Sequence, residues 1–390
     1  MIEIPGIPTT LVRKFIATMT SLGSQISSRK SNNLNILRLL LALAVIVSHS
    51  YPVAQGPGGD TRGEPLNTWT HQQESTGAMA VDLFFLISGL LVTASWLRSR
   101  SMQDYLMKRV LRIYPGFMVA MGFSAALVWS ICPEFRAVVV HPVQWLVLLL
   151  QNLLFLSNSS ICFQGIFAGN PFPSMANASL WTIPWEFSCY LMVLVIGLFC
   201  LFKQRLLIFL GVLVGYDIYA TSLFTGASQF AECLMCFLTG LTIWLWRDKI
   251  PFSKMIAGSC LLALLVTSQF RPWFSILFPI MGGYCLLWIA YGPRLPLSRW
   301  AEKTDLSYGT YLYAFPIQQV LAMNAALRHP WIIFFLATPI TILVAWLSWN
   351  LVEKRFLAMK SKVRHDFDPG AGAEVCESAL TPQPVPRGGP

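Results

Sequence analysis

Long apolar stretches, separated by short basic segments, follow one another along most of this chain. A stretch of about 20 apolar residues is long enough to cross the hydrocarbon core of a bilayer as a helix. The composition agrees, because only 12% of the residues are charged, against roughly 25% in ordinary soluble domains. The pattern therefore predicts an all-α polytopic membrane protein, a bundle of about ten transmembrane helices. The predicted spans are residues 34–53, 78–97, 111–131, 180–202, 205–224, 228–246, 254–270, 273–291, 306–327 and 332–352.

The positions of the basic residues predict which side of the membrane each loop faces. With a cytoplasmic N-terminus and ten spans, and with Arg38 left out because it lies inside the first span, 23 of the 28 Lys and Arg residues fall on the cytoplasmic side. The exterior side keeps only Arg62, Arg136, Arg271 and Arg328. An eleventh apolar run, about 138–157, would abolish this asymmetry if it crossed. Because cytoplasmic loops are rich in Lys and Arg, we expect it not to cross and both termini to be cytoplasmic.

The apolar region divides the chain into three parts. They are a cytoplasmic N-terminal segment (1–33), a membrane domain (34–357) and a cytoplasmic tail (358–390), whose Pro- and Gly-rich end is typical of disorder. No cleavable signal peptide precedes the first span, and no soluble enzymatic domain is evident. The exterior loops 54–77 and 132–179 have a length that is usually functional or disordered. This topology explains the net charge of +10 without a nucleic-acid partner.

Arg38 and His49 lie inside the first apolar run, eleven residues apart. Eleven residues are about three helical turns, so both side chains fall on one face, roughly 16 Å apart along the axis. A charged side chain inside a bilayer costs roughly 3 kcal/mol on insertion scales. The pair therefore favours a lined cavity with chemistry in it. The alternative is that Arg38 snorkels to the interface and His49 makes a contact within the bundle.

Two carboxylates lie at a depth similar to that of His49. Asp82 is near the outer end of the second span, and Glu186 is one to two turns below the exterior surface in the fourth. Either could orient the imidazole, fix its tautomer and raise its basicity. Asp82 could instead only pair with an arginine. His49, Asp82 and Glu186 are the candidate catalytic residues.

The ninth span is unusually polar for a membrane helix, since it holds three Tyr, a Pro and two Gln. Such a helix can line a cavity or pack polar-to-polar against its neighbours. Tyr308 and Tyr311 are candidate donors to an oxyanion. Gln319 is a weaker candidate for contact with the substrate. His71, in the first exterior loop, is a weak candidate for the acceptor side.

A basic cluster occupies the short connection between the second and third spans and includes Lys108, Arg109 and Arg112. Arg109 and Arg112 are three residues apart and would share a face at the start of the third helix. Such a cluster either follows the positive-inside rule or binds a phosphorylated ligand.

The nine Cys residues are scattered, most of them within apolar runs. Cys132 and Cys162 fall in the same exterior segment and could pair in an oxidising compartment. Cys233 and Cys236 lie three residues apart without a second ligand pair, which favours packing over metal or redox chemistry. No metal-ligand spacing appears, and we expect no metal site.

Six short motifs follow one another in a specific order between residues 32 and 357. They are Arg38 followed after ten residues by His49, Val-Asp-x-Phe-Phe-x-x-Ser-Gly from Val81, the basic motif from Lys108 to Pro115, Leu-Trp-x-x-x-x-Glu from Leu180, Ser-Tyr-Gly-x-Tyr-Leu-Tyr from Ser307, and Val-Glu-Lys-x-Phe from Val352. Together they resemble the acyltransferase type 3 family of integral membrane acyltransferases. The chain departs from the family pattern in having Lys at 108 and Pro184 just ahead of Glu186.

Bacterial members of this family O-acetylate surface polysaccharides, O-antigens, exopolysaccharides and Nod factors. The resemblance therefore implies a multi-pass O-acyltransferase of the bacterial inner membrane. It would move an acetyl group from cytoplasmic acetyl-CoA to a hydroxyl of a cell-surface or lipid-linked glycan at the outer face. The acceptor stays open among an undecaprenyl-linked repeat, a finished O-antigen, a lipo-oligosaccharide and peptidoglycan, and the acyl group could be longer than acetyl.

The resemblance also implies roles for the polar residues. Arg38, Lys108, Arg109 and Arg112 would hold the phosphates and the start of the pantetheine arm of acetyl-CoA. His49 would act as general base or as covalent carrier of the acyl group.

Two functions of other classes are compatible with buried polar residues. A transporter or flippase for a lipid-linked glycan or a small anion would also carry Arg and His along its path, although no paired repeats with broken helices are evident. A non-catalytic membrane scaffold would leave Arg38, His49, Asp82 and Glu186 without a role.

Overall fold

The structure is a computed structural model that describes residues 20–29, 31–56, 63–132, 161–162, 165–225 and 229–359. The apolar run at 138–157 lies outside these residues, as do residues 1–19 and the tail from 360.

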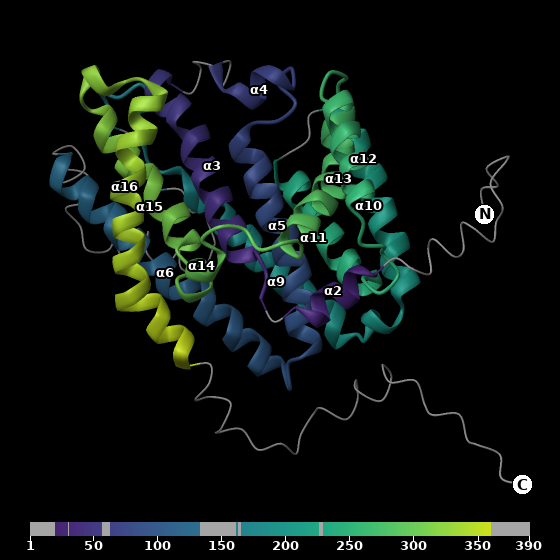
Figure 1. The fold of residues 1–390 in the computed structure, drawn as a ribbon. Coiled ribbons are helices and arrows are strands. Elements are labelled where there is room, and N and C mark those ends of the chain that lie inside the picture. Colours follow the sequence, from purple (N-terminus) through teal and green to yellow (C-terminus); the bar gives the residue numbers. More distant parts are fainter. Residues whose placement is uncertain are drawn as a thin grey trace, which may run out of the picture.

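Helices account for most of the described chain, and each of the ten predicted spans coincides with one of them (Figure 1). The long helices are α3 (Leu34–Gln55), α5 (Thr76–Leu97), α6 (Met102–Ile131), α9 (Thr182–Leu198), α10 (Arg205–Thr225), α11 (Gln229–Trp246), α12 (Lys254–Thr267), α13 (Trp273–Ala290), α15 (Ser307–Ala322) and α16 (Pro330–Ser348). The short elements are α2 (Leu22–Ser28), α4 (Pro65–Trp69), β1 (Ile161–Cys162), β2 (Met175–Asn177), η2 (Ala178–Trp181), η3 (Leu201–Lys203), α14 (Ser298–Lys303), η4 (Ala325–Leu327) and the π-helical turn η5 (Trp349–Glu353).

Seven of the described helices are both long and apolar enough to cross a membrane. They are α3, α5, α6, α9 with η2, α10, α13 and α16 with the residues that follow it. Helices α11 and α12 are apolar but shorter, and α15 has 16 residues. The all-α polytopic architecture is thus confirmed, whereas the number of ten spans stays a prediction.

Helix α5 lies at the centre of the bundle, in contact with α3, α9, α11 and α13 (Figure 1). In its most apolar window 72% of the residues are buried, against 6% in α10. Its closest neighbour is α11. A Cβ on Gly89 would overlap the backbone oxygen of Phe237, and one on Gly240 would overlap that of Leu86. Glycine at these two positions lets the two backbones meet directly.

Helix α15 is buried almost all round, including the polar residues Ser307, Thr310, Gln318 and Gln319. It packs against α3, α6 and α16. The segment before α9 is tied to it, because the Asn177 side-chain amide donates to Leu312 O at 2.9 Å. In that segment β1 and β2 pair antiparallel. This helix is thus held on several sides within the protein.

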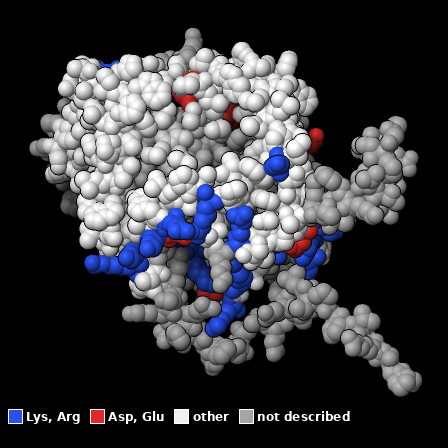
Figure 2. Space-filling model, viewed as in Figure 1, with Lys and Arg blue, Asp and Glu red and all other residues white. Residues whose placement is uncertain are grey.

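The two ends of the bundle differ in charge. At one end, α2 lies beside the connection between α11 and α12, through the hydrogen bond from Leu22 N to Ile250 O. At the other end, α4 lies beside the connection between α12 and α13, through the contact of His71 with Gln269. Lys and Arg gather in a band across the lower part of the face seen in Figure 2, on the α2 side, and the upper part of that face carries few.

Candidate active site

A pocket lies between α3, α5, α6, α9 and α15. Its lining combines apolar side chains with a small number of convergent polar groups, as in most ligand sites. The lining residues are Arg38, Val81, Phe84, Phe85, Ser88, Arg112, Ile113, Thr182, Ile183, Glu186, Ser307, Tyr308 and Tyr311.

Two arginines share one carboxylate at the basic end of this pocket. Arg38 Nη1 donates to Asp305 Oδ2 at 2.9 Å, and Arg112 Nη2 donates to the same oxygen at 2.6 Å. Ser307 Oγ donates to Asp305 Oδ1 at 2.7 Å. Burial alone would raise the pKa of Asp305, but the Arg112 and Arg38 guanidiniums and the Ser307 hydrogen bond hold it well below its usual range. Glu353 is a second buried carboxylate in this group, because its charge acts on both guanidiniums.

Glu186 is the carboxylate that faces the pocket. Ser88 Oγ donates to Glu186 Oε1 at 3.1 Å, and the Tyr190 hydroxyl donates to the same oxygen. The structure thus places the predicted residue Glu186 of α9 beside Ser88 of α5.

Tyr308 and Tyr311 both line the pocket, but they differ in their free hydrogen-bonding capacity. The Tyr308 hydroxyl donates to Ile113 O at 2.9 Å, so its only proton is committed. The Tyr311 hydroxyl is 2.8 Å from Thr182 Oγ1, which also lies 3.5 Å from Ser179 O. Of the two tyrosines, Tyr311 together with Thr182 therefore keeps the better capacity to donate to a substrate oxygen.

His49 is not among the residues that line the pocket. Its ring meets Phe315 edge-on at a centroid distance of 5.3 Å, and Phe315 is one turn after Tyr311 on α15. The Nδ1 atom is buried without a hydrogen-bond partner. Among the described residues, neither Asp82 nor Glu186 is therefore the partner of this nitrogen, and the orientation of His49 by a carboxylate stays a prediction.

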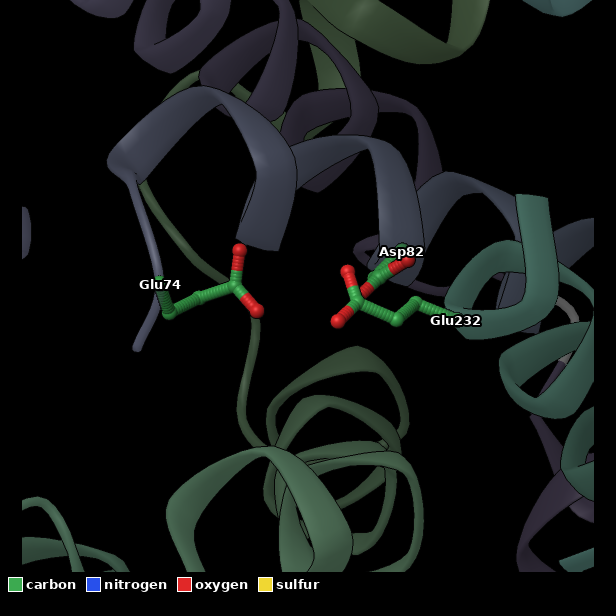
Figure 3. Close-up of side chains that lie close together, drawn as sticks. All are labelled: Glu74, Asp82 and Glu232. Atoms are coloured by element: carbon green, nitrogen blue, oxygen red, sulfur yellow. The ribbon is translucent and has the colours of Figure 1, made fainter. Parts of the chain in front are cut away.

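Asp82 belongs to a separate group of three carboxylates. Glu74 precedes α5, Asp82 lies in its second turn, and Glu232 lies at the start of α11; their side chains point toward one another (Figure 3). Oxygen atoms of all three lie within 4.8 Å of one another, and none of the three takes part in a salt bridge between described residues. Burial and the charges of Asp82 and Glu232 raise the pKa of Glu74 well above its usual value.

Lys108 and Arg109 lie outside the pocket lining. Lys108 Nζ is 2.6 Å from Asp104 Oδ2, one turn earlier on α6. Arg109 donates to Ser95 Oγ at 3.1 Å and lies over the rings of Tyr190 and Tyr105. Of the three basic residues of this motif, Arg112 alone is among the residues that line the pocket.

The two weakest predicted residues lie away from the pocket. Gln319 donates both amide hydrogens to the loop, to Phe172 O and Met175 O at 2.7 Å each, and its Oε1 accepts from Asn170. It therefore anchors the loop and has no free donor for a substrate. His71 is exposed next to α4, and one of its ring nitrogens contacts Gln269.

The cysteine predictions have different outcomes. Cys233 and Cys236 are buried free thiols in α11, and Cys233 forms a hydrogen bond with Asp82. This agrees with packing. Cys132 is buried at the end of α6, but the side chain of Cys162 lies outside the described residues, and the pairing stays a prediction.

Comparison with known proteins decides the family. A family model described as "Acyltransferase domain" matches residues 31–350. The chain belongs to the acyltransferase type 3 family. An "O-acetyl transferase" of Shigella phage Sf6 is 30% identical over 347 residues, which cover 85% of this chain and 98% of the phage protein. "Nodulation protein 10" of Rhizobium leguminosarum bv. viciae is 26% identical over 369 residues, 86% of this chain and 96% of that protein. No solved structure matches.

The family match confirms the resemblance seen in the motifs. It also shows that the chain is an acyltransferase embedded in a membrane. The matched region contains every residue that lines the pocket. Sequence reasoning missed Asp305, Ser88 and Thr182 at this site. Asp305 had a signal, since it is a carboxylate directly before a buried polar helix.

Proposed function

We propose that this acyltransferase moves an acetyl group from acetyl-CoA, bound at the basic end of the bundle, to a hydroxyl of a glycan at the opposite end. One observation carries the proposal: a single pocket joins Arg38 and Arg112 at its basic end to Glu186, Thr182 and Tyr311 deeper in the bundle. The phage relative's name, O-acetyl transferase, supports transfer to oxygen.

The basic end suits the phosphates of the donor. Arginine binds phosphate through paired N–H donors, and Arg38 and Arg112 meet at Asp305 at this end of the pocket. Lys108 and Arg109 lie on the preceding turn of α6 and would add positive potential rather than direct contacts to the pocket. Arg38 and Arg112 are thus the proposed donor-binding pair.

The distance between Arg38 and His49 suits the pantetheine arm. Three turns of α3 separate them by roughly 16 Å along the axis, which is comparable to the length of that arm. The thioester would reach the outer part of the pocket, near Tyr311, when the phosphates lie against Arg38.

The reaction then needs a base and a donor to the oxyanion. His49 Nε2 takes the proton of the acceptor hydroxyl while the oxygen of that hydroxyl forms a bond to the acyl carbon. The Tyr311–Thr182 pair donates to the oxyanion. The carbon–sulfur bond breaks, the coenzyme A thiolate leaves, and it receives the proton from His49. Glu186 is the carboxylate among the residues that line the pocket.

Membrane sidedness follows from the same proposal. Cytoplasmic loops are enriched in Lys and Arg, so the basic end would face the cytoplasm of a bacterial inner membrane, and both termini would lie there. The acceptor, a lipid-linked repeat, an O-antigen, a lipo-oligosaccharide or peptidoglycan, would approach from the other side.

The test uses the purified full chain in liposomes with acetyl-CoA labelled in the acetyl group and a panel of these acceptors. Label is expected in an alkali-labile ester of one acceptor, and His49→Ala is expected to abolish it while the protein stays inserted and folded. Labelled acceptor from His49→Ala at the wild-type rate would refute the role of His49, and the absence of ester with every acceptor would refute the proposed transfer.

A further inference from the structure

Gln318 of α15 is fully buried and reaches the turn of α3 that carries His49. Its Nε2 donates to Ile46 O and to Ser50 Oγ, at 2.8 Å each. Ile46 and Ser50 flank His49 on α3, and the His49 ring packs on Phe315, three residues before Gln318. The side chain of Gln318 therefore lies in the immediate surroundings of the imidazole.

Helix α3 lacks a backbone hydrogen bond close to His49. Pro52 has no N–H, so the carbonyl of Ser48 receives no hydrogen bond from position 52. The helix is thus weakened one residue before His49. The contacts of Gln318 with Ile46 O and Ser50 Oγ brace this same stretch from α15.

Among the described residues, two buried atoms next to this stretch have no hydrogen-bond partner and are not bonded to each other: Nδ1 of His49 and Oε1 of Gln318. An amide oxygen can only accept, whereas Nδ1 can donate when it carries the ring proton. The orientation of the Gln318 amide is fixed, because Ile46 O can only accept and must face the NH₂ group; the oxygen therefore points away from it. A buried polar atom without a partner costs roughly 1–3 kcal/mol, so a bond from Nδ1–H to Oε1 would remove two such costs.

We propose that Gln318, rather than Asp82 or Glu186, is the residue that positions His49. Its Oε1 accepts Nδ1–H in the reacting enzyme, which holds the proton on Nδ1 and leaves the lone pair on Nε2 to take the proton of the acceptor. Hydrogen bonds of this kind are often long in the free enzyme and tighten in the complex. The inference rests on the proposed role of His49 and adds to it the residue that selects the tautomer.

The direct test is the tautomer of His49 in the full chain, reconstituted in nanodiscs with ¹⁵N-labelled histidine. The sequence contains only five His residues, and His49→Ala assigns the signal. The ¹⁵N shifts are expected to show the proton on Nδ1 in the wild type, and to show the Nε2–H form gaining population in Gln318→Met. A wild-type His49 protonated on Nε2 would overturn the proposal, whether or not the variant folds.

Kinetics supply the second readout. Gln318→Met is expected to lower kcat roughly 10- to 100-fold, the scale of a misplaced catalytic group, with little change in the KM for acetyl-CoA. Gln319→Met is the matched control, because it removes the same number of amide donors from the next residue of α15 but touches only the loop. Its folded fraction should keep a kcat within about twofold of wild type.

The outcomes separate the two proposals. If His49→Ala is inactive and Gln318→Met keeps full kcat, the positioning role fails and the proposed function stands. If His49→Ala is active, both fail. If Gln319→Met loses kcat as much as Gln318→Met, the effect is a general loss of packing and the positioning role is overturned.

Discussion

Asp305 illustrates how one residue can decide the charge of a site. It is the shared partner of Arg38 and Arg112, with its side chain only 12% exposed. Removing one partner of a buried ion pair leaves the other charge uncompensated. We therefore expect Asp305→Asn to lower the free energy of unfolding by roughly 3 kcal/mol, measured by thermal unfolding in detergent. Asp104→Asn removes the partner of the more exposed Lys108 and should cost about 1 kcal/mol or less.

The same variant reports on the donor site. If the phosphates of coenzyme A bind between Arg38 and Arg112, they supply the negative charge that Asp305→Asn lacks. Coenzyme A should then raise the melting temperature of Asp305→Asn more than that of the wild type. An equal or smaller shift in the variant would argue against phosphate binding at this pair.

Glu74 gives stability a dependence on pH. Its pKa in the folded protein is raised by burial and by the charges of Asp82 and Glu232, so the folded state binds this proton more tightly than the unfolded chain does. The associated stability is present below the ordinary carboxyl pKa and is lost as the pH rises through the raised value. Glu74→Gln should therefore raise the melting temperature at pH 8 more than at pH 5.

A matched control for Glu74 is Glu302, which is partly exposed and paired with Arg294 at 3.3 Å. Glu302→Gln should show no gain that grows with pH. A melting temperature for Glu74→Gln that falls below wild type at pH 8 would contradict the repulsion argument.

Five residues that the sequence singled out line one pocket, and their roles stay predictions. They are Arg38, Arg112, Glu186, Tyr308 and Tyr311. Helical spacing fixes depth but not the direction in which a side chain points across the bundle. The spacing alone therefore could not tell whether His49 pairs with a carboxylate. Asp305 and Gln318 were missed because their meaning lies in partners far away in the chain.

At the scale of elements, the close packing of α5 against α11 can be tested directly at two glycines. A Cβ on Gly240 would overlap the Leu86 backbone oxygen, and a backbone atom cannot move aside as a side-chain end can. We expect Gly240→Ala, and likewise Gly89→Ala, to destabilise the protein by roughly 1–3 kcal/mol, as overpacking does. Thermal unfolding of the purified variants measures this.

Gly258 of α12 provides the opposite case, since nothing lies within 4 Å of an added Cβ there. Gly258→Ala should stabilise the helix by about 0.5–1 kcal/mol, the usual difference between these residues in a helix interior. Equal effects at Gly240 and Gly258 would contradict the close approach of α5 and α11.

Elements were well predicted because hydropathy over about 20 residues is a strong signal. Each of the ten predicted ranges contains a helix. The prediction was less informative for α15, where polar residues satisfied inside the protein resemble the polar residues of a cavity wall. Gln319 is the example, since its hydrogen bonds to Phe172 O and Met175 O could not be read from its own surroundings in the sequence.

At the scale of the whole molecule, the asymmetry of charge and the pocket together predict sidedness. Lys and Arg gather toward one end of the bundle on the face shown in Figure 2, Arg38 and Arg112 line the pocket, and basic segments stay on the cytoplasmic side. Labelled acetyl-CoA added to sealed inverted membrane vesicles should therefore acetylate an acceptor enclosed in the lumen. Sealed right-side-out vesicles should give no label until detergent opens them. Arg38→Ala should lose the label in inverted vesicles at low acetyl-CoA. Equal labelling by both kinds of sealed vesicle would mean that the donor does not enter from the basic end.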